Sequence, residues 1–151
     1  MKKTTIITLT LLLFFEITNC YSQDQEIVLP NGTAGGSITV LPNGNFVVVD
    51  AGYDNGSTID VGAVYLFAGA SKTLISTIKG SNTNDKIGLY GITVLNNGNF
   101  LILSPYWRNG AATRAGAVTW ASSTTGVSGV VSSANSFVGS SSNDEVGQFI
   151  R

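Results

Sequence analysis

The residues best suited to chemistry in this chain are three aspartates that lie close together in the sequence, Asp50, Asp54 and Asp60. Carboxylates are the ligands that calcium prefers, so these acids are the candidates for a metal site. The chain contains a second copy of this stretch, in which the equivalent positions hold Ser104, Arg108 and Arg114. A metal site built on a repeated segment would not carry arginines there, which leaves an isolated calcium site in the first repeat as the alternative. We therefore expect no metal and no cofactor, and expect ion pairs between repeats instead, Asp54 with Arg108 and Asp60 with Arg114.

Catalytic side chains are scarce. The chain has no histidine, and its one cysteine, Cys20, lies near the N-terminus. The commonest general base and the best protein nucleophile are therefore missing from most of the chain. Asp144 and Glu145 are adjacent, so on a strand their side chains would point to opposite faces. We expect that the chain is not an enzyme.

Aromatic residues provide the remaining candidates for binding. The position of Tyr53 is taken in the second copy by Trp107, and Tyr106 stands beside it. Exposed tyrosine and tryptophan can stack on sugar rings or anchor a protein partner. The alternative is that these rings fill the apolar space between repeats. We take Tyr53, Tyr106 and Trp107 as the ligand-binding candidates.

The N-terminus resembles a signal peptide, with Lys2 and Lys3 before an apolar run from Ile6 to Phe15. The run is too short to span a bilayer as a helix. We expect cleavage after Ser22, which would make the chain a secreted or cell-surface protein. The alternative is lipid attachment at Cys20, but the preceding Asn19 is bulkier than the residue usual before such a cysteine, which favours simple secretion.

The charge of the chain from residue 23 onward argues against nucleic acid as a partner. Six lysines and arginines face eight carboxylates, and charged residues make up only 11% of the whole chain. A nucleic-acid-binding protein would show a basic patch. We expect no nucleic-acid partner and no membrane span in the mature chain.

The elements that position these residues come from an internal repeat. ITVLPNGNF at 38–46 returns as ITVLNNGNF at 92–100, and GAVYLF from Gly62 returns as GAVTW from Gly116. The offset from Ile38 to Ile92 equals that from Gly62 to Gly116, and such a fixed period indicates one supersecondary unit per repeat. Each copy contains short β-rich runs separated by glycine- and asparagine-rich turns, with apolar cores at 46–49 and 100–103.

Each repeat therefore predicts a four-stranded antiparallel meander. The expected strands of the first are 37–41, 45–51, 62–68 and 72–79, and those of the second are 91–95, 99–104 and 116–121. Five residues are inserted in the second repeat between Trp120 and Gly139, so 127–133 and 136–138 should form its last edge. We predict an all-β fold of about two β-propeller-type blades, an incomplete propeller. A sandwich of two sheets packed face to face is the alternative.

The predicted boundaries are a signal peptide at 1–22, a lead-in at 23–36, a first repeat at 37–90 and a second at 91–144. Asp144-Glu145-Val146-Gly147 repeats Asp85-Lys86-Ile87-Gly88, so residues 145–151 are expected to start a third repeat.

The stretches GNFVVVDAGYDNG, VGAVYLFAG and GSNTNDKIG resemble the FG-GAP repeat of integrin-α-like β-propellers. The second copy, from 98 to 147, is similar to tandem repeats of large secreted, haemagglutinin-like bacterial surface proteins. The resemblance implies propeller blades over residues 37–147. FG-GAP blades often bind calcium in an aspartate-rich loop between the first two strands. That loop here is Pro42-Asn43-Gly44 or Asn96-Asn97-Gly98, without a carboxylate, so calcium binding does not carry over.

These patterns together predict a non-enzymatic, adhesin-like or ligand-recognition protein that binds a protein or a glycan. Uncovered blade faces also predict self-association. The alternative is a fragment of a larger multi-blade protein, an enzyme or its accessory domain, without activity of its own.

Overall fold

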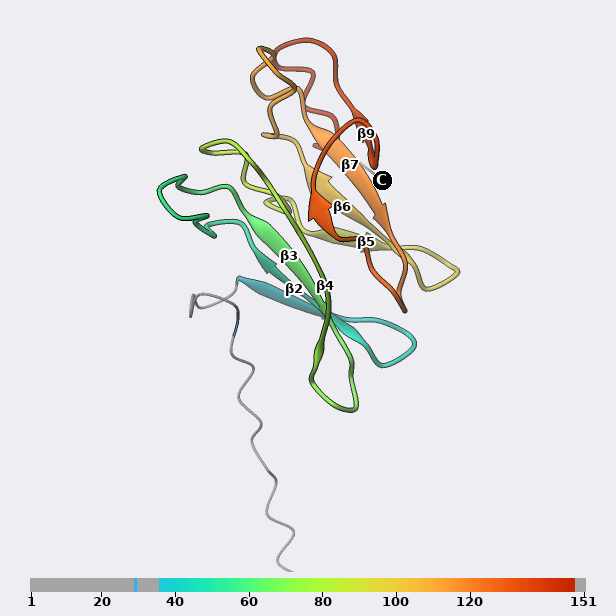
Figure 1. Ribbon diagram of the computed structural model, residues 1–151. Helices are drawn as coiled ribbons and strands as arrows, with labels where there is room; N and C mark the ends of the chain where they lie inside the picture. Colours follow the sequence, from blue (N-terminus) through green and yellow to red (C-terminus); the bar gives the residue numbers. More distant parts are fainter. Residues whose placement is uncertain (1–28, 30–35, 149–151) are drawn as a thin grey trace, which may run out of the picture.

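The computed structural model describes Leu29 and residues 36–148, and this part of the chain contains strands and turns but no helix (Figure 1). It accordingly contains no helix that is long and apolar enough to cross a membrane. The first repeat forms one sheet from β1 (Ser37–Val40), β2 (Phe46–Asp50), β3 (Ala63–Phe67) and β4 (Leu74–Lys79), each antiparallel to the next. This confirms the meander that was predicted for the first repeat.

The second repeat forms a separate sheet in the order β5-β6-β7-β9. Its strands are β5 (Ile92–Val94), β6 (Phe100–Ser104), β7 (Ala117–Ala121) and β9 (Ser136–Val138), again antiparallel neighbours. The two sheets are not closed into a barrel. The predicted all-β fold with tandem repeats is therefore confirmed.

The tight turns between the first two strands of each repeat follow from their glycines. The Gly44 N–H donates to the Leu41 carbonyl at 2.9 Å, and the Gly98 N–H donates to the Leu95 carbonyl at 2.8 Å. Both glycines have φ near +85°, a left-handed conformation that glycine adopts without steric cost. The PNG and NNG motifs are thus two copies of one turn.

The glycine of the GAV motif is required for a different reason, which is the close approach of another backbone segment. Gly62 and Gly116 have φ of 73° and 80°. A Cβ atom at Gly62 would lie 2.2 Å from the backbone nitrogen of Ile87, and one at Gly116 would lie 2.2 Å from that of Val146. Only glycine allows the end of each repeat to run this close to the start of its third strand.

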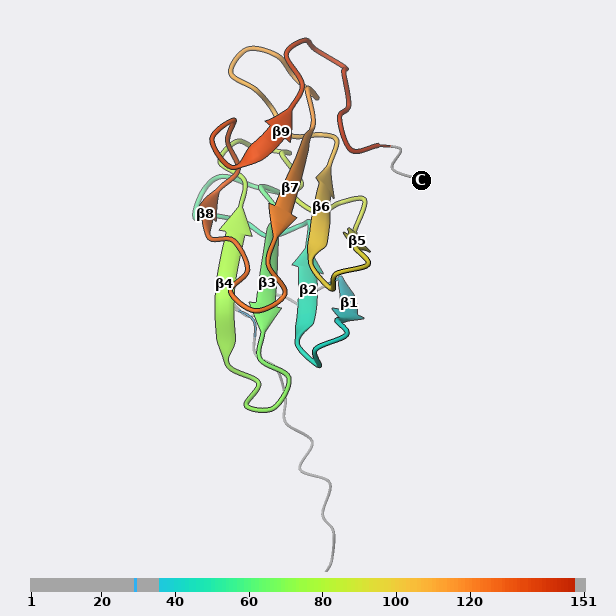
Figure 2. The same ribbon diagram turned by 90° about the vertical axis from the view of Figure 1, so that its right-hand side faces the viewer.

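The five-residue insertion of the second repeat does not simply lengthen its own edge. β8 (Gly129–Val130) pairs in parallel with β4, opposite Ile78 and Lys79, so it is the fifth strand of the first sheet (Figure 2). The expectation that 127–133 forms an edge of the second sheet is therefore wrong, whereas 136–138 takes that place as β9. The insertion crosses to the first sheet because the free edge of β4 offers unpaired backbone groups.

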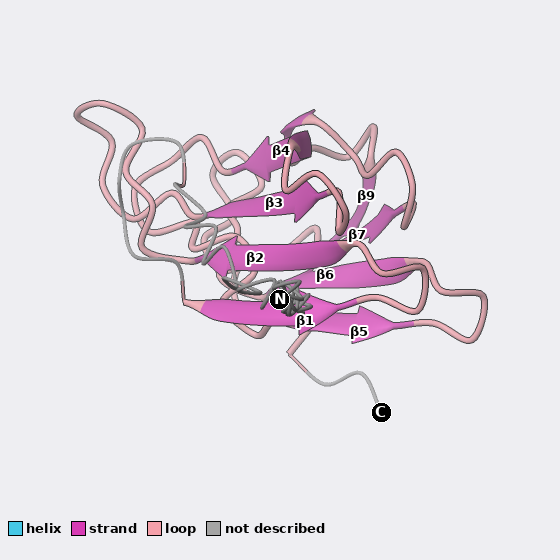
Figure 3. Cartoon of the chain, turned by 90° about the horizontal axis from the view of Figure 1, so that it is seen from below, coloured by secondary structure: helices cyan, strands magenta, loops and turns pink. Residues whose placement is uncertain are grey.

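The two sheets pack face to face (Figure 3). The alternation of side chains along each strand decides which faces meet. We call the face of the first sheet that carries Val47, Val49, Val64, Leu66 and Ile78 its back face, and the opposite face its front face. In the second sheet the equivalent back-face positions hold Leu101, Leu103, Val118, Trp120 and Phe137. The back face of the first sheet packs against the front face of the second, which carries Phe100, Ile102, Ala117 and Ala121.

A second apolar cluster covers the front face of the first sheet. Phe46 and Phe67 stack there with ring centroids 5.3 Å apart, and Tyr65 lies 6.4 Å from Phe67. Leu29 belongs to this cluster and is buried in it. β2 and β3 are thus buried on both faces, which is why their sequences are apolar without alternation.

Several sequence predictions concern residues outside the described part of the chain: the signal peptide at 1–22, lipid attachment at Cys20, and all of the lead-in at 23–36 except Leu29 and Gly36. Of the predicted third repeat, residues 145–148 are described. The Val146 N–H donates to the Ala115 carbonyl at 3.1 Å, as the Ile87 N–H donates to the Val61 carbonyl at 3.1 Å. Residues 145–148 therefore close the second repeat as 86–89 close the first.

Equivalent positions in the two repeats should differ in their contribution to stability. Ile78 on β4 is 1% exposed, and Phe137, its equivalent on β9, is 75% exposed. We expect Ile78→Ala to lower the free energy of unfolding by about 2–5 kcal/mol, because it leaves a cavity between the sheets. Phe137→Ala is the matched control and should change it by less than about 0.5 kcal/mol. Urea unfolding of both variants measures this, and equal losses would contradict the packing described above.

Candidate functional site

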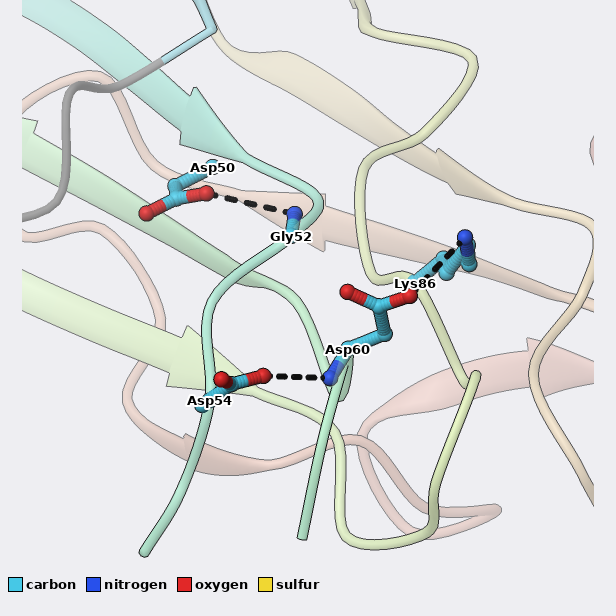
Figure 4. A network of polar contacts seen from close by, with 5 residues as sticks. All are labelled: Asp50, Gly52, Asp54, Asp60 and Lys86. Atoms are coloured by element: carbon cyan, nitrogen blue, oxygen red, sulfur yellow. Dashed lines mark hydrogen bonds and ion pairs between the residues drawn. The ribbon is translucent and has the colours of Figure 1, made fainter.

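The three aspartates of the candidate metal site lie around the loop between β2 and β3, and each carboxylate has a structural partner (Figure 4). Asp50 Oδ1 accepts a hydrogen bond from the Gly52 N–H at 3.2 Å, and Asp54 Oδ1 accepts one from the Asp60 N–H at 2.7 Å. The Asp60 carboxylate pairs with the Lys86 ammonium at 3.1 Å. Within the described residues, no group of three or more acids, histidines or cysteines is placed to hold a metal ion.

The ion pairs of the two repeats are equivalent but opposite in sign. Asp60 pairs with Lys86 in the first repeat, and Arg114 pairs with Glu145 in the second. Positions 60 and 114 correspond, as do 86 and 145, so the acid and the base have exchanged places. All four residues have φ between 47° and 54°, and their backbones also bond in the same way, Lys86 N–H to the Asp60 carbonyl at 3.1 Å and Glu145 N–H to the Arg114 carbonyl at 3.0 Å.

The predicted ion pairs between repeats, Asp54 with Arg108 and Asp60 with Arg114, are therefore wrong. Within the described residues, neither is an ion pair. The reason is local: positions 60 and 86 approach each other inside the first repeat, since the end of the repeat runs beside the start of β3. Asp60 and Arg114 each form an ion pair with a residue of their own repeat instead.

Asp85 joins the two repeats through its carboxylate. Its Oδ2 accepts hydrogen bonds from the Ser81 and Asn82 N–H groups at 3.0 and 2.8 Å, which closes its own turn. Its Oδ1 accepts the Arg108 N–H of the second repeat at 3.1 Å. The side chain is almost fully buried, so its partners must replace the water it has lost.

Tyr53, a predicted ligand-binding residue, is buried in the front cluster of the first sheet, edge-on to Tyr65 at 6.4 Å. Burial raises the pKa of the Tyr65 phenol above its ordinary value, and the nearby Tyr53 and Asp50 raise it further. Within the described residues, the Tyr65 hydroxyl has no hydrogen-bond partner. This cluster is a packed core, so Tyr53 does not present its ring to a ligand here.

Trp107, the second predicted ligand-binding residue, is also buried and belongs to the core between the two sheets. Its indole Nε1–H has no partner within the described residues. The structure thus places Trp107 where the alternative expectation had it, in the apolar space between repeats.

Tyr106, the third predicted residue, is only half-buried. Its ring lies 6.3 Å from that of the exposed Tyr90, and the Arg114 guanidinium sits over it at 4.5 Å from the ring centroid. Of the three predicted aromatics, Tyr106 alone keeps a surface position, which it shares with Tyr90 and a cation.

The largest exposed aromatics that the sequence analysis missed are on the back face of the second sheet. Trp120 on β7 is 51% exposed, and Phe137 on β9 is 75% exposed. Val118 faces Phe137 across the β7–β9 ladder, and Trp120 faces Leu101 on β6. The repeat offset aligns Trp120 with Leu66, and with the five inserted residues added it aligns Phe137 with Ile78, but this alignment does not show that either residue is exposed.

These observations define a two-repeat, all-β protein whose second sheet exposes an apolar face. A protein-family model matches residues 40–89 and 94–148, and its description is "Repeat of unknown function (DUF5650)". The chain belongs to this family, and the two matched segments correspond to its two repeats. Comparison with the curated proteins found no match, and comparison with the solved structures found none either.

The commitment of the aspartates to backbone and lysine partners leads to a prediction about calcium. A ligand that binds only the folded state raises stability by RT ln(1 + [L]/Kd). We expect the melting temperature of the chain to be the same in millimolar calcium and in EDTA. Differential scanning calorimetry measures this, and an upward shift with calcium that Asp54→Asn abolishes would establish a metal site in this loop.

The exchanged ion pairs lead to a second prediction. Asp60→Arg places a cation beside Lys86 and should lower the free energy of unfolding by up to about 1 kcal/mol, since both partners are partly exposed. Adding Lys86→Glu recreates the polarity of the second repeat's ion pair and should restore the lost stability. Urea unfolding at low and high salt measures the coupling, which should shrink as salt rises. A double variant as unstable as Asp60→Arg alone would show that the pair's polarity is not interchangeable.

Proposed function

We propose that this chain is a secreted or cell-surface, non-enzymatic repeat protein that acts by binding, as an adhesin-like or ligand-recognition module. The observation that carries the proposal is the exposed apolar back face of the second sheet, with Trp120 and Phe137 outward. Exposed aromatic side chains on one face of a sheet are typical anchors for a protein or a glycan partner.

The acidic residues support a non-enzymatic role. Every aspartate and glutamate within the described residues has a structural partner that organises a turn or an ion pair. The backbone N–H partners and cations account for Asp50, Asp54, Asp60, Asp85, Asp144 and Glu145. An acid or base in catalysis must instead be aimed at a substrate. Export is supported by the basic start and apolar run of residues 2–15.

The proposal includes a propeller-type arrangement. The two four-stranded meanders pack face to face with β1 and β5 at the same side (Figure 3), which resembles the relation between neighbouring propeller blades. The resemblance of residues 37–147 to FG-GAP repeats supports the same arrangement.

Binding arrays test the proposed function. We expect the labelled full chain to bind at least one glycan or protein class on an array. Trp120→Ala and Phe137→Ala should each weaken that binding about tenfold or more, as truncation of an anchor residue does. Val40→Ala is the matched control, because Val40 is 69% exposed but lies on β1 of the first sheet.

Two array results would contradict the proposal. One is no binding to any class, and the other is binding that neither back-face variant weakens. In the second case Tyr106→Ala should be tested next, since Tyr106 and Tyr90 form the other exposed aromatic pair. Trp107→Ala is not a useful probe, because Trp107 is part of the core between the sheets.

A further inference from the structure

The back face of the second sheet occupies repeat positions that are an interface in the first sheet. In the first sheet these positions are buried by the next repeat: Leu66 and Ile78 are each 1% exposed beneath it. Their equivalents Trp120 and Phe137 are 51% and 75% exposed. These two positions of the face are therefore covered in the first repeat and open in the second.

The covering sheet in the known interface has a distinct side-chain pattern. Phe100 and Ile102 project from β6, and small residues, Ala117 and Ala121, project from β7. Two packed sheets lie about 10 Å apart, and their side chains must interdigitate. The small residues on β7 leave room for large ones opposite. A face with Trp120 and Phe137 therefore suits a partner sheet that also carries small side chains on its third strand.

Polar groups at the rim of the known interface also recur. Asn43 and Asn45 donate from their side-chain amides to the Ser123 carbonyl at 2.8 and 2.9 Å, and Asp85 Oδ1 accepts the Arg108 N–H. These three bonds cross from the first repeat to the second.

The equivalent groups of the second repeat are Asn97, Asn99 and Asp144. They keep their bonds within the repeat: Asn97 Oδ1 accepts the Asn99 N–H, Asn99 Oδ1 accepts the Ser123 N–H, and Asp144 Oδ2 accepts the Ser140 and Ser141 N–H groups. Within the described residues, the two side-chain amide nitrogens and Asp144 Oδ1 have no partner. The second repeat thus presents both the apolar face and the three polar groups of an interface.

The chain's own first sheet does not fit that interface. Where the covering sheet has Thr119 and Ala121, the front face of the first sheet has Tyr65 and Phe67, which fill the space that the small residues leave open. Tyr65 and Phe67 are also already buried in the cluster that includes Leu29. A second copy stacked head to tail is therefore not the occupant.

We propose that the back face of the second sheet docks the front face of another repeat of the same family. The partner is a four-stranded sheet with two large apolar residues on its second strand and alanine or threonine on its third. It also supplies a loop N–H to Asp144 and a carbonyl to Asn97 and Asn99. The inference rests on the proposed function, because it names the partner of the same face.

The experiment supplies such a repeat in register. A second copy of residues 92–148 is attached after Ile150, which keeps the spacing found between Gly80 and Gly139 at the ends of successive repeats. Phe137→Cys, in a Cys20→Ser background, places a single reactive thiol on the back face of the full chain. We expect the extension to slow thiol labelling at position 137 about tenfold or more. Val40→Cys is the matched control, and its labelling should not change.

A companion variant tests the face itself. Trp120→Glu in the full-chain part buries a charge without a partner if the extension docks, so it should restore labelling at position 137. Three results would overturn the inference: equal labelling with and without the extension, protection that Trp120→Glu leaves intact, or protection of the unextended chain that grows with its concentration. The last would make a second copy the occupant.

The labelling and the array experiments can fail separately. Protection by the extension without any array binder would keep the docking of repeats and remove recognition of a foreign ligand. An array binder that needs Trp120, together with an unprotected thiol, would keep the proposed function and remove the docking of repeats.

Discussion

The packing of the first sheet's back face against the second sheet's front face is the contact on which the rest of the structure depends. β2 and β3 are apolar on both sides, so the first sheet cannot be stable in water with either side open. Val47, Leu66 and Ile78 are covered by Phe100 and Ile102 in a single core. The hydrogen bonds of Asn43 and Asn45 to the Ser123 carbonyl, and of the Arg108 N–H to Asp85, cross the same contact.

Because the two repeats have similar sequences, the closing segment of each must bind to its own repeat and not to the other. The closing segment of each repeat binds beside its own third strand, through Gly62 in one case and Gly116 in the other. If the closing segments were exchanged, Asp60 would meet Glu145 and Lys86 would meet Arg114, which places like charges together. The reversed polarity of the two pairs therefore disfavours the exchanged arrangement, as charges do in other specific pairings. β8 adds a physical tie, because it joins the second repeat to β4 of the first.

The same contact explains why the two repeats have diverged unevenly. Buried positions of the first repeat have equivalents that are exposed in the second, and the small residues of β7 have bulky aromatic equivalents on β3. A residue's environment in this chain depends on its place in the stack as well as on its place in the repeat. The exposure of Trp120 and Phe137 follows from this rule, because within the described residues no further sheet packs on the back face of the second sheet.

The sequence by itself determined the repeat, the all-β class and most strand positions, because these depend on local patterns: the PNG and NNG turns, the apolar runs and the constant offset between the two copies. It did not determine which residues are exposed, because Tyr53 and Trp107 are buried by segments distant in the sequence. The partners of Asp60 and Arg114 and the crossing of β8 were likewise decided by tertiary structure. The partners of Asp60 and Arg114 depend on how the end of each repeat folds back beside its own third strand, and the crossing of β8 depends on how the two sheets pack. The local sequence pattern carries no information about either approach.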